Sequence, residues 1–205
     1  MPESKTPDAC RIGVTFIEAQ LTMLCAYASF LSDWIERGAP APEFTKAQAL
    51  LDRKRSNPEA HTHSEDGTPG KSTPSDSALS WPSFDTAEKR IAFAMIVPCT
   101  NAILAVAEYF DIHRLSPSRT PEVQFLMRLR DAAVNGNTFS IPADEYLPHA
   151  AYAGLIVDPA LDGSLLFSDG AKPGFIEFGD TVGLLRYLTK LLKSMQSAIS
   201  GGDAG

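Results

Sequence analysis

Arg130 is the side chain of this sequence that most clearly requires a chemical partner, because it interrupts an apolar helix face. With helical spacing, residues 121–137 place Val123, Leu126, Met127, Ala133 and Val134 on one stripe. Arg130 falls in the middle of that stripe. Burying an unpaired guanidinium costs on the order of several kcal/mol, so it must meet a carboxylate, backbone carbonyls, a phosphate or a partner chain. Glu108 and Asp131 are the candidate carboxylates within the chain.

The opposite stripe of the same segment is polar and contains Gln124, Arg128, Asp131 and Asn135. Arg128 and Asp131 are three residues apart, which is the spacing of an ordinary ion pair on a helix surface. More basic side chains precede the segment, at His113, Arg114 and Arg119. The chemistry that these residues offer is anion binding or ion pairing.

The elements that position these residues are mostly helices. Thr120, Pro121 and Glu122 form a good helix start, and Gly136 ends that helix before an extended exit through Asn137. Apolar periodicity predicts long helices over 11–37, 86–110 and 180–197, with Asp85 and Asp180 as N-caps. Residues 153–157 and 164–167 are predicted to pair as a hairpin, and 174–178 as a further short strand. The predicted fold is mainly α, a helical bundle with a small C-terminal β hairpin or short sheet.

A single domain over 1–205 is predicted, because the chain can bury one core and nothing requires a second. Residues 43–55 are predicted to form a shorter helix. Residues 56–80 contain almost nothing to bury, so we predict a disordered insertion there, and a mobile tail over 199–205. His61 and His63 lie in the insertion without a second pair nearby, so no metal site and no cofactor are predicted.

The composition argues for a soluble cytoplasmic protein. The net charge of −7 disfavours an overall electrostatic design for nucleic acid or an anionic membrane, although a local basic patch remains compatible with it. Three cysteines lack metal or redox spacing, which indicates reduced thiols, and two of them lie in apolar runs typical of a core. No signal peptide or uninterrupted apolar span of about 18 residues is visible, so no membrane association is expected.

The segment 130–137 resembles the end of the signature helix of the HEPN superfamily of helical-bundle ribonucleases and their inactive relatives. That family's motif is Arg, usually followed by Asn, then three residues and a His, often continuing with Gly-Asn. Here the frame reads Arg-Asp-Ala-Ala-Val-Asn-Gly-Asn. Residues 152–156, 166–167 and 179–180 also look like a HEPN-type subgroup with a small β element. The resemblance covers about residues 85–197 and implies RNA as substrate, cleaved without metal, commonly across a homodimer interface.

Departures from the motif point toward lost chemistry. Asn135 stands where the His is expected, and an amide does not titrate near neutral pH, so it cannot act as general acid or base. Asp131 replaces the usual Asn and adds a negative charge beside Arg130. Replacement of the missing base by His149 or by His113 is a further hypothesis.

Two functions follow. The first is a HEPN-like homodimeric domain of a toxin–antitoxin or defence system, an endoribonuclease in ancestry, with catalysis weakened or lost. Its candidate catalytic residues are Arg130, Asn135 and His149, and its candidate RNA- or partner-binding residues are Arg128, Asn137, Arg114 and Arg119. The alternative is a non-catalytic protein-interaction module. The first predicts that Arg130, Asn135 and Asn137 line a cleft or two-fold interface; the second predicts that Arg130 meets an acid of its own chain.

Overall fold

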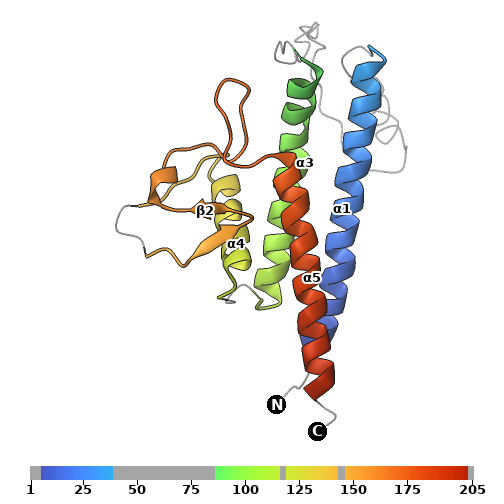
Figure 1. Cartoon of the computed structure of the whole chain (residues 1–205), viewed down its shortest axis with the longest axis vertical. Helices are drawn as coiled ribbons and strands as arrows, with labels where there is room; N and C mark the ends of the chain where they lie inside the picture. Colours follow the sequence, from blue (N-terminus) through green and yellow to red (C-terminus); the bar gives the residue numbers. More distant parts are fainter. Residues whose placement is uncertain (1–5, 39–85, 116–118, 143–145, 203–205) are drawn as a thin grey trace, which may run out of the picture.

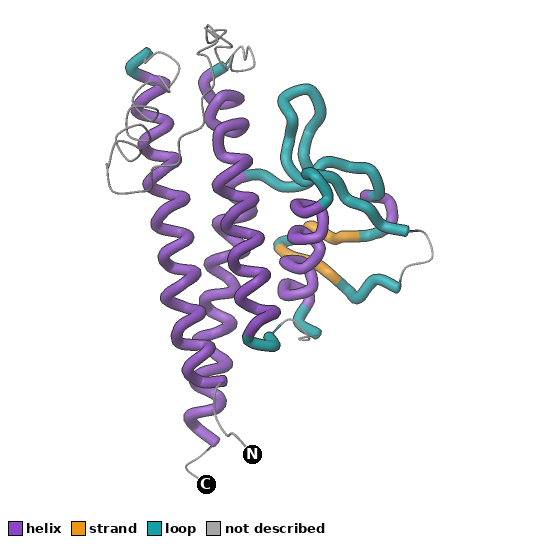
Figure 2. Tube along the Cα trace, turned by 180° about the vertical axis from the view of Figure 1, so that it is seen from behind, coloured by secondary structure: helices purple, strands orange, loops and turns teal. Residues whose placement is uncertain are grey.

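In the part of the chain that the structure describes, three long helices form the body of the molecule. The computed structural model describes residues 6–38, 86–115, 119–142 and 146–202. Helix α1 (Thr6–Glu36) packs along α5 (Phe178–Gly202) and α3 (Ala87–Ile112), while the short α4 (Pro121–Val134) lies against α3 (Figure 1). A small β element, a two-stranded sheet followed by one 3₁₀ turn (Pro159–Leu161), covers the far side of α4 (Figure 2). The prediction of a mainly helical bundle with a small C-terminal sheet is confirmed.

The buried face of α1 explains why this sequence forms a long packed helix. Cys10, Ile17, Leu24 and Leu31 recur every seven residues, and each is at most 2% exposed. This spacing keeps one stripe in contact with neighbouring helices over the whole length. Gly13 permits a close approach of α1 to the Tyr109 side chain, because a Cβ there would lie 2.7 Å from the Tyr109 ring.

The ends of the helices differ in detail from the prediction. Helix α3 is capped by Thr86, whose hydroxyl accepts a hydrogen bond from the Lys89 N–H at 3.3 Å; the predicted cap, Asp85, lies outside the described residues. Helix α5 begins at Phe178, and the Asp180 carboxylate in its first turn accepts from the Glu177 N–H at 2.9 Å. The same helix runs on to Gly202 and so includes 199–202 of the predicted mobile tail, whose mobility stays a prediction.

In the hairpin, the predicted strand within 153–157 pairs with the residues before it and not with 164–167. Strand β1 (Ala150–Tyr152) pairs antiparallel with β2 (Leu155–Val157), and the turn between them uses positive φ at both Ala153 and Gly154. Such a two-residue turn matches the twist of a hairpin, so the strands pair locally. Leu165, predicted to belong to that hairpin, instead bridges to Thr138 at the exit of α4.

The third predicted strand, 174–178, is not formed as a strand. Phe175 and Ile176 donate backbone hydrogen bonds to Leu165 and Leu166 at 2.8 and 3.0 Å, but the next residues enter α5. The predicted helix over 43–55 and the predicted disordered insertion over 56–80 lie outside the described residues, as does the 203–205 part of the predicted tail.

Two described helices are long and apolar enough to cross a membrane by length and composition alone. They are the Asp8–Glu36 part of α1 and the Lys89–Ile112 part of α3, with mean hydropathies of 1.4 and 1.8. Core helices of soluble proteins pass the same test. The absence of membrane association therefore stays a prediction.

The three cysteines should react at very different rates. Cys10 and Cys99 are buried, whereas Cys25 is exposed. Burial raises the pKa of the Cys99 thiol to about 11, an effect that a hydrogen bond with Thr181 partly opposes. Because the thiolate is the nucleophile, we expect one thiol per chain to react rapidly with an aromatic disulfide reagent at pH 8, and all three in urea. Cys25→Ser should abolish the fast phase; two fast thiols would contradict the packing of α1 or α3.

Candidate functional site

Arg130 lies between two acids of its own chain. Its guanidinium bonds to the Asp111 carboxylate, in the last turn of α3, and to Asp131, with Nε–Oδ1 and Nη2–Oδ1 distances of 3.2 and 3.0 Å. Asp131 was one of the two predicted partners. The other, Glu108, was wrong, because Asp111 takes that place one turn further along α3.

These acids decide the charge state of the arginine. The Arg130 side chain is 29% exposed. Partial burial by itself would lower its pKa, but the hydrogen bonds and charges of Asp131 and Asp111 outweigh burial and raise the pKa. Arg130 is therefore a permanent cation whose charge is already compensated, and each partly exposed pair contributes at most about 1 kcal/mol to stability.

Arg128 belongs to the same cluster of charges. Its guanidinium lies 3.8 Å from Asp131, as the three-residue spacing predicted, and its side chain is 18% exposed. Arg128, Arg130, Asp111 and Asp131 together carry no net charge. A phosphate approaching this cluster would have to displace carboxylates that are already bonded, so the cluster offers an anion little attraction.

The apolar stripe predicted for α4 is only partly correct. The buried residues of this helix are Val123, Phe125, Leu126, Met127, Leu129 and Ala132. They cover a wide arc because α3 packs on one side of the helix and β1 on another. Val134, predicted on the buried stripe, is 73% exposed at the helix end.

The two amide side chains of the motif form hydrogen bonds with backbone groups. Asn135 is the C-cap of α4, and its Nδ2 donates to the Thr138 carbonyl at 3.0 Å. Asn137 has a positive φ of 68°, and its Nδ2 donates to the Phe167 carbonyl at 2.8 Å while its Oδ1 accepts from the Phe167 N–H at 2.9 Å. Both side chains therefore fix the turn after α4.

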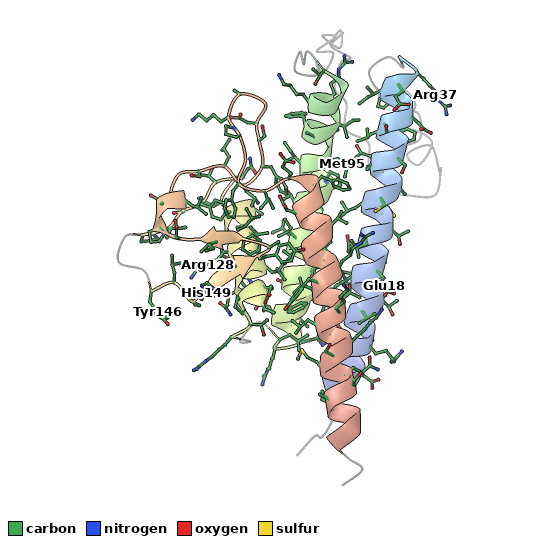
Figure 3. All side chains as sticks on the ribbon, in the orientation of Figure 1. Glu18, Arg37, Met95, Arg128, Tyr146 and His149 are labelled. Carbon is green, nitrogen blue, oxygen red and sulfur yellow. The ribbon has the colours of Figure 1, made fainter. Side chains whose placement is uncertain are left out.

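Neither histidine proposed as a replacement base is joined to Arg130. His113 caps the end of α3, and its ring lies 4.3 Å from the Tyr109 ring. His149 precedes β1, and Figure 3 shows it in the same region as Arg128, near the hairpin side of α4. In the part of the chain that the structure describes, no hydrogen bond or ion pair links His149 to Arg130 or Asn135.

The basic connection between α3 and α4 is exposed at its described ends. Arg114 takes the left-handed conformation, with φ of 56°, in a helix stop in which the Leu115 N–H donates to the Phe110 carbonyl at 2.7 Å. Arg119 is exposed just before the Thr120 cap. The chain's predicted binding arginines are thus divided between this connection and the neutral cluster on α4.

Sequence reasoning missed an open pocket of about 550 Å³. It lies between the N-terminal half of α3 and the start of α5, and Lys89, Ile91, Met95, Phe167, Ile176 and Phe178 are among its lining residues. None of the predicted site residues lines it. Its lining is mostly apolar and comes from segments far apart in the sequence. No local sequence pattern could therefore have predicted it.

The structure also bears on metal binding. Within the described ranges, no group of three or more His, Cys, Asp or Glu side chains is placed to hold a metal ion.

Comparison of the chain with protein-family models, with curated proteins and with solved structures found no match.

Proposed function

We propose that this chain is a non-catalytic helical module that acts by binding another protein chain. The observation that carries the proposal is the pairing of Arg130 with Asp111 and Asp131. These two carboxylates neutralise the arginine that stands at the Arg position of the motif. The motif's amides are likewise bonded to backbone groups. Within the described residues, the titratable groups bonded to this arginine are the two carboxylates that pair with it, and no histidine is among them, so proton transfer to or from a bound substrate lacks an unengaged base.

A second candidate is a HEPN-like endoribonuclease of a toxin–antitoxin or defence system. The partial exposure of the Arg130 side chain favours it, since 29% of that side chain still meets solvent. This candidate requires RNA phosphate to compete successfully with two carboxylates.

Cleavage of labelled single-stranded and transfer RNA in EDTA separates the two candidates. We expect no cleavage by the native chain, by Arg130→Ala or by His149→Ala, because the cation is neutralised and the carboxylates beside it are held in ion pairs. Cleavage by the native chain that Arg130→Ala abolishes would overturn the proposal. A matched variant, Arg128→Ala, removes a neighbouring cation of the same cluster and controls for loss of charge.

A second variant tests whether the acids hold back an RNA site. Asp111→Asn frees one side of Arg130 while keeping the size of the side chain. Under the proposal, its affinity for RNA stays within about twofold of that of the native chain, the change expected from one partly exposed charge that salt screens. A tenfold or larger gain in affinity would instead identify Arg130 as a masked phosphate site.

A further inference from the structure

Helix α1 carries a second apolar seam that the described elements leave largely exposed. Its members are Ile12, Phe16, Ala19, Met23, Ala26 and Phe30, separated by steps of four and three residues. Ile12, Met23 and Phe30 are 49%, 69% and 59% exposed, and both alanines are exposed as well. Phe16 is half-buried because its ring stacks on Tyr109 at 5.5 Å. We name these six residues the outer seam.

The outer seam has the spacing of a helix-packing surface. Alternating steps of four and three residues keep side chains on one line when two helices wind around each other. The buried stripe of α1 has the same seven-residue period, and neighbouring helices cover it. The outer seam extends over about 27 Å of helix, at 1.5 Å per residue. The described helices therefore bury one apolar face of α1 and leave most of the outer seam in solvent.

We propose that the outer seam binds the outer seam of a second copy of this chain, with the two α1 helices antiparallel. The proposal rests on the proposed interaction function and names its partner. An antiparallel register in which paired residue numbers add to 42 sets Ala19 against Met23, and Phe16 against Ala26, of the other copy. Each of these two layers joins a large side chain with a small one, as close packing requires, and the outermost layer sets Ile12 against Phe30.

The parallel alternative packs less well. In it every residue of the outer seam meets its own copy, so Phe30 would face Phe30 while Ala19 and Ala26 would face alanines. The layers would then alternate between crowding and gaps, both of which cost stability.

Charge supports the same arrangement. Between residues 12 and 32 of α1 the only charged residue is Glu18, which pairs with Lys193 of α5 at 2.8 Å, so a chain of net charge −7 meets itself here with little repulsion. Arg11 and Asp33 are exposed at opposite ends of α1, where they pair with Asp8 and Arg37 of their own chain. The antiparallel register brings the Asp8–Arg11 pair of one copy near the Asp33–Arg37 pair of the other, so both signs of charge meet at each end, whereas in a parallel pair each charge meets its own copy.

The first test is the mass of the full chain by sedimentation over a concentration series, in the native form and in two matched variants. We expect twice the 22.1 kDa chain mass for the native protein. Met23→Glu places a charge in the outer seam, twice per dimer, and should weaken association at least about a hundredfold. Val134→Glu adds the same charge at a similarly exposed apolar residue on α4, and should leave the dimer intact. Circular dichroism and urea unfolding confirm that each variant folds.

The second test is orientation, measured by disulfide cross-linking in a Cys25→Ser background. Ile12→Cys and Phe30→Cys chains should cross-link when mixed, because the register sets residue 12 beside residue 30 of the other copy. Neither chain should cross-link alone. Self-linkage of each single variant would establish a parallel pair and overturn the register.

The remaining outcomes also decide the proposal. A native chain that stays monomeric at all concentrations overturns it, as does a dimer dissolved by Val134→Glu and not by Met23→Glu. Flotation of a monomer with phosphatidylcholine vesicles, lost in Met23→Glu, would assign the outer seam to lipid instead. None of these results bears on RNA cleavage, so the proposed non-catalytic function and this dimer can fail separately.

Discussion

Replacing Phe125 by alanine is expected to lower the free energy of unfolding by about 3–5 kcal/mol, the range for deleting a fully buried aromatic side chain. Phe125 is 1% exposed on α4. Its ring centroid lies 6.0 Å from that of Tyr152 in β1 and 6.0 Å from that of Phe175. Phe175 in turn meets Phe139 edge-on at 5.4 Å. The deletion therefore leaves a cavity where α4, the hairpin and the segment before α5 meet.

Urea unfolding followed by circular dichroism measures this effect. Tyr146→Ala is the matched control, because it also removes an aromatic ring but from a residue that is 87% exposed, where we expect a change within about 0.5 kcal/mol. A loss below about 1 kcal/mol for Phe125→Ala would mean that the β element is not held to α4 through this ring.

The long helices could be predicted because their signal is local. In α1 and α3, apolar residues recur within each turn, and the pattern identifies the helix before any partner is known. The same pattern does not say how many faces are covered. Apolar residues surround much of α1, yet the described neighbours bury only the stripe that includes Ile17 and Leu24.

The β element was harder to predict from the sequence, because the pairing of its strands depends on turn geometry. The sequence pattern of residues 150–152 did not predict a strand. The turn at Ala153 and Gly154 needs positive φ at Ala153, a conformation that an alanine side chain disfavours. The pairing of Leu165 with Thr138 joins segments separated by the whole hairpin. Neither contact leaves a periodic signal in the sequence.

The candidate site was predictable to the extent that its contacts are close in sequence. Asp131 is adjacent to Arg130, and Arg128 is one helical turn from Asp131, so both pairs followed from spacing. Asp111 is nineteen residues from Arg130 and reaches it only because α3 and α4 pack side by side. The roles of the two amides depended on the path after Gly136, which the sequence described only as extended.

Asn137→Ala is expected to cost about 3 kcal/mol of unfolding free energy. The substitution removes both hydrogen bonds to the Phe167 backbone, leaves that N–H and carbonyl without their partners in a part-buried site, and puts alanine at a φ of 68°. A lost hydrogen bond with an orphaned partner costs about 1–3 kcal/mol, and the left-handed conformation about 1 kcal/mol more. Thermal or urea unfolding measures the sum.

Two further variants separate these causes. Asn137→Gly tolerates the positive φ but keeps neither hydrogen bond, so it should recover about 1 kcal/mol relative to Asn137→Ala. Asn137→Asp keeps the acceptor for the Phe167 N–H but sets an ionised carboxylate oxygen against the Phe167 carbonyl oxygen, so at neutral pH it should be less stable than the native residue. If Asn137 served only to contact RNA, all three variants would unfold like the native chain. Graded destabilisation without RNA would instead show that the Asn following Gly136 fixes the fold, whatever the chain binds.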